Sequence, residues 1–286
     1  MPPSLDPLFR PASIAVVGAS RRPHTIGWQI VDNLLRHGYT GVLHPVNPHA
    51  RSVHSIPAHP SVEAIPGPVD LAIIVVPKEE VLEVVEACGR KGVAGLVVIS
   101  AGFKEMGGEG IEREQELQRR ARALGMRLVG PNCMGILNTQ AEWSMNATFA
   151  PSMPPPGPMS FMSQSGAMGV TILDYAAEYG IGIHHFVSVG NKADVSGNDL
   201  LEYWAEDEGT RVILLYLENF GNPRRFIPLA RRITRHKPVV VVKSGRTGAG
   251  ARAAASHTGV LAGADVATDA LLAQCGVLRA ESVQEL

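Results

Sequence analysis

His257 lies in a run of small residues, Ala253 to Gly259 (AAASHTG), that leaves room beside the imidazole for a bulky anion. The glycine-rich loop 244–252 precedes this run and follows an apolar stretch typical of a buried strand. A neutral imidazole nitrogen is a nucleophile near neutral pH and can carry a phosphoryl group. The pattern favours a phosphohistidine. A loop histidine bonded to the backbone is the alternative, because the chain has 10 histidines and residue type alone decides nothing.

A second loop rich in serine and glycine, Ser163–Gly169, follows a strand-like run and opens a helix of small and apolar residues. The free N–H groups at a helix start can bind an anion, although a well-capped helix start has the same composition. Glu218 ends another strand-like run. A carboxylate that accepts from one imidazole N–H leaves the other nitrogen free to attack. We therefore expect the two loops and Glu218 to converge on His257, the alternative for Glu218 being a solvent-exposed turn. The predicted phosphate-binding residues are Ser163, Gln164, Ser165, Gly166, Ala167, Ser256, Thr258 and Gly259.

The turn Gly18–Gly27 near the N-terminus follows a strand-like run and precedes a helix, so its backbone can approach a phosphate. It lacks the Gly-x-Gly-x-x-Gly spacing, and no acidic residue for a ribose diol ends the next strand, which disfavours a nicotinamide cofactor and a dehydrogenase. Arg21 and Arg22 suit a ligand with several phosphates, because guanidinium groups pair bidentately with phosphate oxygens. Two solvated loop arginines are the alternative.

These loops are positioned by alternating strand-like and amphipathic runs, which predict an α/β fold with parallel sheets. The expected strands are 13–17, 42–46, 71–76, 96–99, 127–129, 159–162, 184–189, 212–217 and 239–242. The expected helices are 27–36, 78–89, 110–124, 167–179, 199–206, 223–236 and 264–274. The proline-rich stretch 151–158 cannot continue a helix or strand and predicts a boundary between domains at 1–150 and 151–286. At the C-terminus, 281–286 has the composition of a helix start with Ser282 as its cap.

Composition narrows the class of protein further. The 286 residues are 45% hydrophobic, enough for two cores, and the net charge of −1 gives no field that would recruit nucleic acid or an anionic membrane. Three scattered cysteines indicate a reducing compartment and neither a disulfide framework nor a zinc site, and we expect no metal bound by this chain. No signal-like or membrane-spanning run is visible. We expect a soluble cytoplasmic protein.

The first half of the sequence resembles the CoA-binding domain of the NDP-forming acyl-CoA synthetases. The resemblance rests on SIAVVGAS (13–20), 46–48, 71–78, ISAGFK (99–104) and GPNCMGI (130–136). It implies a Rossmann-like domain that holds coenzyme A, with Asn132 and Cys133 near its thiol end. A small buried residue is an equally good account of Cys133. The residues implied to bind CoA are Gly18, Ala19, Ser20, Arg21, Arg22, Asn47, Val76, Pro77, Ser100, Ala101, Gly102, Asn132 and Cys133.

The second half is similar to the flavodoxin-like, succinyl-CoA ligase-like domain of the same superfamily, through 163–169, GNKADVS (190–196), 217–219 and SHTG (256–259). The resemblance implies that His257 is phosphorylated and that Glu218 orients it. GNKAD and SHTG look more like the ADP-forming acetyl-CoA synthetases than succinyl-CoA synthetase. No ATP-grasp domain is present, so a β subunit or a fused domain is expected to bind ATP or ADP with Mg²⁺.

The resemblance further implies a small carboxylic acid as substrate and an oligomeric assembly. It leaves open which acid is used and whether ADP or GDP is preferred. The alternative function is a CoA- or acyl-CoA-sensing regulatory module of a larger protein, such as a lysine acetyltransferase.

Overall fold

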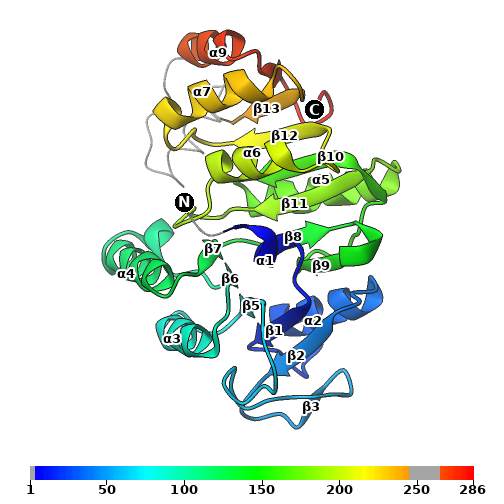
Figure 1. Cartoon of the computed structure of the whole chain (residues 1–286), viewed down its shortest axis with the longest axis vertical. Helices are drawn as coiled ribbons and strands as arrows, with labels where there is room; N and C mark the ends of the chain where they lie inside the picture. The colour runs from blue at the N-terminus through cyan, green and yellow to red at the C-terminus, as the bar shows by residue number, and fades with distance from the viewer. Residues whose placement is uncertain (1–3, 245–264) are drawn as a thin grey trace. The chain divides into compact units, whose positions relative to one another are not determined.

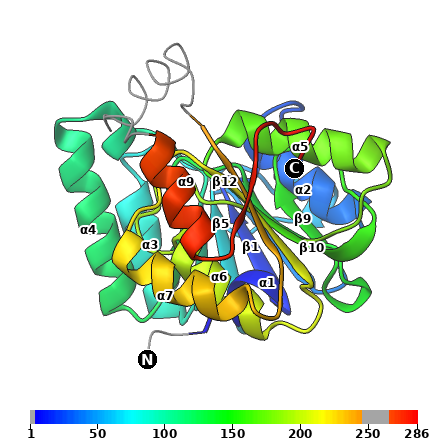
Figure 2. The same ribbon diagram turned by 90° about the horizontal axis from the view of Figure 1, so that it is seen from above.

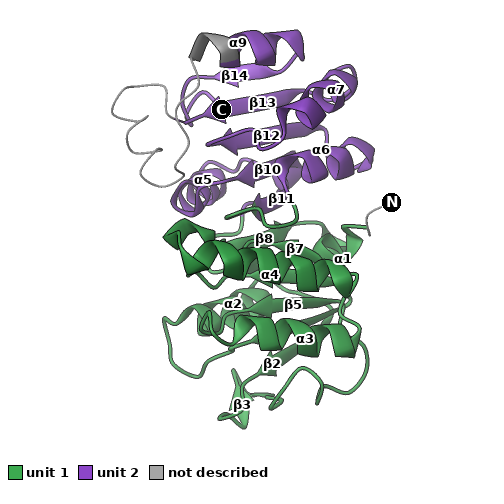
Figure 3. Cartoon of the chain, turned by 90° about the vertical axis from the view of Figure 1, so that its left-hand side faces the viewer, with its two compact units in different colours: residues 1–153, 188–195 green, residues 154–187, 196–286 purple. Residues whose placement is uncertain are grey.

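The computed structural model describes residues 4–244 and 265–286 and divides into two compact units. The first unit is Met1–Met153 with Ser188–Val195, and the second is Pro154–Val187 with Ser196–Leu286 (Figure 3). The short segment 188–195 thus packs with the first unit although it follows the proline-rich stretch by some distance in the chain. Both units are α/β folds, which confirms the predicted fold class.

The first unit is built on five parallel strands in the order β2-β1-β5-β6-β7 (Figure 1). Four of the five strands are buried along their whole length, as expected for apolar runs covered on both faces. The edge strand β2 is exposed at its start, in keeping with its mixed sequence VLHPV. The strand bounds are β1 Ser13–Val17, β2 Val42–Val46, β5 Leu71–Ile74, β6 Gly95–Val98 and β7 Arg127–Val129.

Helices cover both faces of this sheet, with α2 (Ile26–Arg36) on one side and α3 (Val81–Lys91) and α4 (Glu109–Ala123) on the other (Figure 2). Each helix buries a largely apolar stripe, as its spacing predicts, although Asn33 of α2 and Glu114 of α4 are buried too. The helix α3 ends where Gly92 takes the left-handed conformation at φ 81°, which glycine adopts without strain. The short helix α1 (Asp6–Phe9) buries Leu8 and Phe9.

Several short elements of the first unit were not predicted from the sequence. They are the β3 (Ser52–Val53) and β4 (Ile56–Pro57) hairpin, the antiparallel pair β8 (Gly135–Asn138) and β9 (Met145–Thr148), and the 3₁₀ turns η1 (Lys104–Met106) and η2 (Ala141–Trp143). The sequence of β9 alternates apolar and polar residues, yet all four are buried, Asn146 and Thr148 included. The α2 residue Asn33 donates to the carbonyls of Thr148 and Ala150, both at 2.8 Å, which stabilises a polar interior that periodicity does not predict.

The second unit contains five neighbouring strands in the order β14-β13-β12-β10-β11. Numbered by their position in the chain, these strands follow the order 2-1-3-4-5 of flavodoxin-like folds, and the five strands of the first sheet follow it too. The strands are β10 Pro156–Ser163, β11 Ile183–Ser188, β12 Val212–Leu217, β13 Val239–Lys243 and β14 Leu278–Ala280. The helix α5 (Gly166–Glu178) covers one face, and α6 (Gly197–Glu206), α7 (Pro223–Ile233) and α9 (Asp265–Gln274) cover the other (Figure 2).

Two expectations for the second half were wrong. Strand β10 begins inside the proline-rich stretch, because prolines without N–H groups still offer carbonyls: Pro155 O accepts from Ile183 N at 3.0 Å and Pro158 O from Arg211 N at 2.8 Å. Residues 281–286 form turns and no helix, although Ser282 Oγ does accept from Glu285 N at 3.1 Å. Among the described residues, no helix is long and apolar enough to cross a membrane.

Candidate functional site

The first unit changes strand order between β1 and β5, and the loops that follow these two strands touch there. Gly18 has φ +91°, and a Cβ at this position would lie 2.5 Å from the carbonyl oxygen of Val75. Gly27 is equally restricted, since its Cβ would lie 2.1 Å from Gly18 O. Only glycine permits both approaches. Ligands of open α/β sheets bind at such a switch point, where two neighbouring loops open in opposite directions.

Hydrogen bonds join the remaining loops at this edge into one continuous structure. Asn47, after β2, donates from Nδ2 to Ala19 O at 2.7 Å. Ser100, after β6, donates from Oγ to Val76 O at 2.5 Å, and its own carbonyl accepts from Asn132 N at 3.0 Å. The five loops after β1, β2, β5, β6 and β7 therefore meet at one edge of the sheet. The predicted CoA-binding residues of the sequence all lie in these loops.

These loop residues differ in what they offer to a ligand. Arg21 and Arg22 are exposed, as are Pro77 and Ala101, whereas Ala19 and Gly102 are buried. Asn132 is exposed with φ 56°, directly after the cis peptide bond between Gly130 and Pro131. The exposed members can contact a ligand with their side chains, and the buried glycine and alanine shape the backbone.

Cys133 is buried, and its Sγ donates to Val98 O at 3.3 Å. Burial raises the pKa of its thiol to about 12, only partly opposed by backbone hydrogen bonds. The thiol is therefore protonated and unreactive near neutral pH. The geometry supports the small buried residue and not a nucleophile.

The second unit has its own switch point between β10 and β12, and a glutamine side chain bridges it. Gln164 Oε1 accepts from the backbone N–H groups of Glu218 at 2.8 Å and Asn219 at 3.0 Å. Its Nε2 donates to Asn219 O at 2.7 Å. The side chain predicted to bind phosphate is thus engaged with the backbone around Glu218. Gln164 sets the distance between the Ser163 loop and Glu218.

The start of α5 is arranged as a capped helix with accessible glycine. Ser165 is the N-cap, and its Oγ accepts from Met168 N at 3.4 Å. Ser163 is buried and donates from Oγ to Ser165 O at 2.6 Å, so its hydroxyl serves the loop itself. No atom of the described residues lies within 4 Å of the Gly166 Cβ position, and Ala167 is exposed. Ser165 caps the N–H of Met168, which leaves the N–H groups of Gly166 and Ala167 as the ones that an anion at this helix N-terminus could use.

The structure places Glu218 beside this helix start, half-buried after β12. Burial and the negative charge of Glu218 raise the pKa of Tyr216. Ser244, which begins the glycine-rich loop, donates from its backbone N–H to Leu217 O at 2.9 Å, one residue before Glu218. His257, Ser256, Thr258 and Gly259 lie outside the described residues, so their predicted roles stay predictions.

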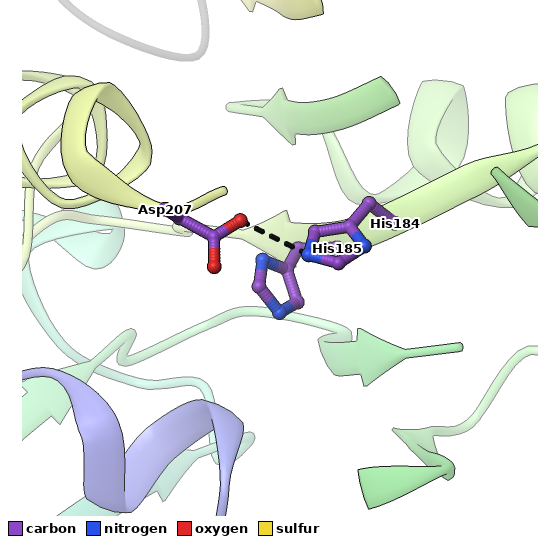
Figure 4. Close-up of side chains that lie close together, drawn as sticks. All are labelled: His184, His185 and Asp207. Carbon is purple, nitrogen blue, oxygen red and sulfur yellow. Dashed lines mark ion pairs between the residues drawn. The ribbon is translucent and has the colours of Figure 1, made fainter. Parts of the chain in front are cut away.

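A polar cluster in the second unit was not predicted from the sequence. His184 and His185 on β11 and Asp207 after α6 place metal-ligating atoms within 4.8 Å of one another, and all three residues are buried (Figure 4). Asp207 Oδ2 lies 3.0 Å from His184 Nε2 and accepts from Thr210 N at 2.9 Å and Thr210 Oγ1 at 2.6 Å. A metal would have to displace these contacts. We therefore interpret the cluster as a hydrogen-bonded support at the amino end of the sheet, which strand spacing does not reveal.

Two domain families match the chain in this order: residues 12–139 match a CoA binding domain, and residues 156–286 match a succinyl-CoA ligase like flavodoxin domain. The acetate–CoA ligase [ADP-forming] I subunit alpha of Pyrococcus furiosus is 46% identical over 286 residues, covering 99% of this chain and 62% of the relative. Acetate–CoA ligase [ADP-forming] I of Archaeoglobus fulgidus is 48% identical over 282 residues, covering 99% of this chain and 41% of the relative.

Among solved structures, the acetyl-coenzyme A synthetase 1 of Ca. Korarchaeum cryptofilum, described as dinucleotide forming and in complex with phosphate and ADP, superposes with a TM-score of 0.92 at 46% identity. The match covers 98% of this chain and 60% of that one. Fold and site define an α/β protein composed of a CoA-binding domain and a flavodoxin-like ligase domain. The chain belongs to the NDP-forming acyl-CoA synthetase superfamily and spans about two fifths to three fifths of the length of these relatives.

Proposed function

We propose that this chain is the CoA-binding and phosphohistidine-carrying part of an ADP-forming acyl-CoA synthetase. Its first domain, 1–150, would bind CoA, and its second, 151–286, would carry the phosphoryl group on His257. The observation that carries the proposal is the Gln164 bridge, which holds Glu218 beside the N-terminus of α5. Relatives named as ADP-forming acetate–CoA ligases support it.

The reaction runs in three transfers. Inorganic phosphate attacks the thioester carbonyl of an acyl-CoA, the C–S bond breaks, and CoA leaves as the thiol. The unprotonated imidazole nitrogen of His257 then attacks the phosphorus of the acyl phosphate, and the carboxylate leaves. Phosphohistidine finally gives its phosphoryl group to ADP and forms ATP. Glu218 would fix the imidazole tautomer, and the N–H groups of the first turn of α5 would stabilise the phosphoryl charge.

The nucleotide chemistry requires a partner. We propose an ATP-grasp β subunit or fused domain that binds ADP and supplies Mg²⁺ with the nucleotide. The group of His184, His185 and Asp207 does not suit this ion, because Mg²⁺ prefers oxygen ligands and retains several waters. The relatives' names indicate acetate, and we propose a small carboxylic acid as the substrate class.

Phosphorylation of the histidine provides the direct test. The chain and its ATP-grasp partner are incubated with acetyl-CoA and radiolabelled phosphate, and the protein is separated from free phosphate. Acid-labile label on this chain is expected, and it should be lost in His257→Asn. A control, His49→Asn, changes an exposed histidine of the first unit and should keep the label.

Two outcomes would contradict the assignment. Label that persists in His257→Asn would move the phosphorylated residue elsewhere. Measurable CoA binding without any label would instead favour the CoA-sensing module. The relatives reported above are all named as ligases or synthetases and give that alternative no support.

A further inference from the structure

The segment 188–195 lies along the end of β7 in the first unit, although it follows β11 in the chain. Its backbone is bonded at successive points: Val195 N donates to Leu128 O at 3.0 Å, Ala193 N to Gly130 O at 3.0 Å, and Asn191 N to Pro131 O at 2.9 Å. Beside them, Arg127 and Asp194 form a buried ion pair with Nε and Oδ2 at 2.8 Å. This anchoring brings the side chain of Asn191 to the loop that follows β6.

The Asn191 amide is fully used there. Its Nδ2 donates to Glu105 Oε2 at 2.5 Å and to Glu114 Oε2 at 2.7 Å. Its Oδ1 accepts from Asn132 Nδ2 at 3.3 Å. Rotating the amide by half a turn would direct its oxygen at two carboxylates, so only one orientation is compatible with these neighbours. Asn191 thus separates two acidic groups and contacts a residue implied to lie near the CoA thiol.

Glu105 transmits this contact to the loop backbone. Its Oε1 accepts from Gly102 N at 2.5 Å and Phe103 N at 3.1 Å, so a carboxylate of the chain already occupies these two donors. Burial acts to raise the pKa of Glu105, but the hydrogen bonds from Asn191, Gly102 and Phe103 outweigh it and lower that pKa. The carboxylate is therefore charged near neutral pH and holds the loop firmly.

Glu114 completes the arrangement from α4. It is 7% exposed, and its Oε2 also accepts from Lys104 N at 3.2 Å. Burial, only partly opposed by the hydrogen bond from Asn191, raises the pKa of Glu114. Glu105 and Glu114 can lie close together only while a hydrogen-bond donor stands between their carboxyl groups, because two neighbouring negative charges repel each other.

We infer that Asn191 is a positioning residue for coenzyme A: it fixes, through Glu105, the conformation in which Ser100, Ala101 and Gly102 receive the ligand. The inference rests on the proposed function of the first domain. Asn191 itself need not touch CoA. Its effect comes from the N–H donor that it places between two carboxylates. Substitution by aspartate replaces that donor with an acceptor and leaves the size of the side chain unchanged.

The test measures CoA affinity of the full chain by isothermal titration calorimetry. Asn191→Asp replaces the donor with a charged acceptor of the same shape and is expected to weaken CoA binding by roughly tenfold or more, since hydrogen bonds to charged groups are lost. Asn191→Ala removes the donor without adding charge and should weaken binding by a smaller factor. Circular dichroism and urea unfolding establish that each variant is folded.

Exchanging the hydrogen-bond donor and acceptor between two residues distinguishes a role in positioning the loop from a general destabilisation of the fold. In Asn191→Asp with Glu105→Gln, the glutamine amide can donate to the new carboxylate at position 191 while its oxygen still accepts from the loop, and the net charge equals that of the original pair. We expect this double variant to recover part of the lost affinity, because the contact with position 105 is restored while the new carboxylate still faces Glu114. The control, Gln118→Ala, removes a side-chain donor to Ala193 O in the same segment and should leave CoA affinity within about threefold.

The outcomes are distinct. Affinity of Asn191→Asp and Asn191→Ala within about threefold of the original chain would overturn the inference, and so would an equal loss in Gln118→Ala or a swap that recovers nothing. An original chain that fails to bind CoA would instead remove the proposed function of the first domain.

Discussion

The two units share a strand order but join the loops at their switch points in different ways. In the first unit, the absence of a side chain at Gly18 lets the loop after β1 contact the loop after β5. The carbonyl of Val75 lies where the Cβ of any other residue would be. In the second unit, the Gln164 side chain crosses the gap with three hydrogen bonds to backbone groups. The loop after β1 leaves Arg21 and Arg22 exposed, where we propose that an extended ligand binds. The amide bridge lies at the start of α5, where we propose that a phosphoryl group binds.

The comparison implies that the two sites tolerate different changes. A glycine in the left-handed region with backbone nearby cannot accept any side chain, because neither partner can move. A glutamine bridge can lose its bonds and still leave both loops in place, at a cost set by the unpaired backbone groups. Substitutions at the first switch point should therefore have the larger effect.

The largest effect is expected for Gly18→Ala. Left-handed strain and overlap with Val75 O together should lower the free energy of unfolding by about 3 kcal/mol and abolish measurable CoA binding. Urea unfolding and calorimetric titration with CoA measure the two effects. Gly67→Ala is the matched control, because Gly67 has φ +79° but no described atom lies within 4 Å of its Cβ position. Equal losses in both variants would show that strain alone, and not the close approach, matters.

Asp207→Asn should destabilise the second unit by about 2 kcal/mol, because the carboxylate accepts from Thr210 and His184 in a buried setting. Burial acts to raise the pKa of Asp207, but those hydrogen bonds and the two imidazoles lower it below its ordinary value. A depressed carboxyl pKa contributes stability that is present above the unfolded pKa and is lost as the pH falls through the folded pKa.

Urea unfolding across acidic pH measures this contribution, with Glu208→Gln, an exposed neighbour, as the control. The pH-dependent difference between the original chain and Asp207→Asn should shrink at low pH. CoA affinity should not change. A Zn²⁺-dependent rise in stability that Asp207→Asn removes would contradict the supporting role and favour a metal site.

Gln164→Ala should lower the free energy of unfolding by about 1–2 kcal/mol through the backbone groups it leaves unpaired. Phosphorylation of His257 should fall because Glu218 is no longer held, while CoA affinity stays the same. The radiolabel assay and calorimetry measure the two sites separately. Gln115→Ala, an exposed glutamine of α4, is the control. Weakened CoA binding in Gln164→Ala would contradict the separation of the two switch points.

The smallest effect concerns Cys133. Because burial raises the pKa of its thiol to about 12, the thiolate population near neutral pH is negligible and iodoacetamide should not modify it in the folded chain. Peptide mass spectrometry after alkylation, with and without urea, checks this expectation. Rapid modification of Cys133 in the folded chain would contradict its burial and would favour the interpretation of Cys133 as a nucleophile.

Much of this architecture could be predicted because buried parallel strands are continuous apolar runs, as in Leu71–Ile74 and Val239–Lys243. The expected strands and helices were found within a few residues at most positions. The buried, partly polar strand Met145–Thr148 was not predicted. The hydrogen bonds that stabilise this region come from Asn33, which lies more than 100 residues earlier in the chain. The roles of Gln164 and Asn191 could not be predicted for the same reason. Their hydrogen-bond partners lie far away in the sequence and are identified only by interatomic distances in the structure.

The order of residues alone determined the fold class and the candidate loops, because hydrophobic periodicity and short glycine-rich turns are local properties. The superfamily followed from the resemblance of its motifs. Tertiary structure decided which side chains of these loops are exposed and which hold the loops together. Gln164 and Cys133 lie in the predicted loops, yet each is hydrogen-bonded to groups distant in the chain. Hydrogen bonding and burial depend on three-dimensional neighbours, and no spacing along a sequence encodes them directly.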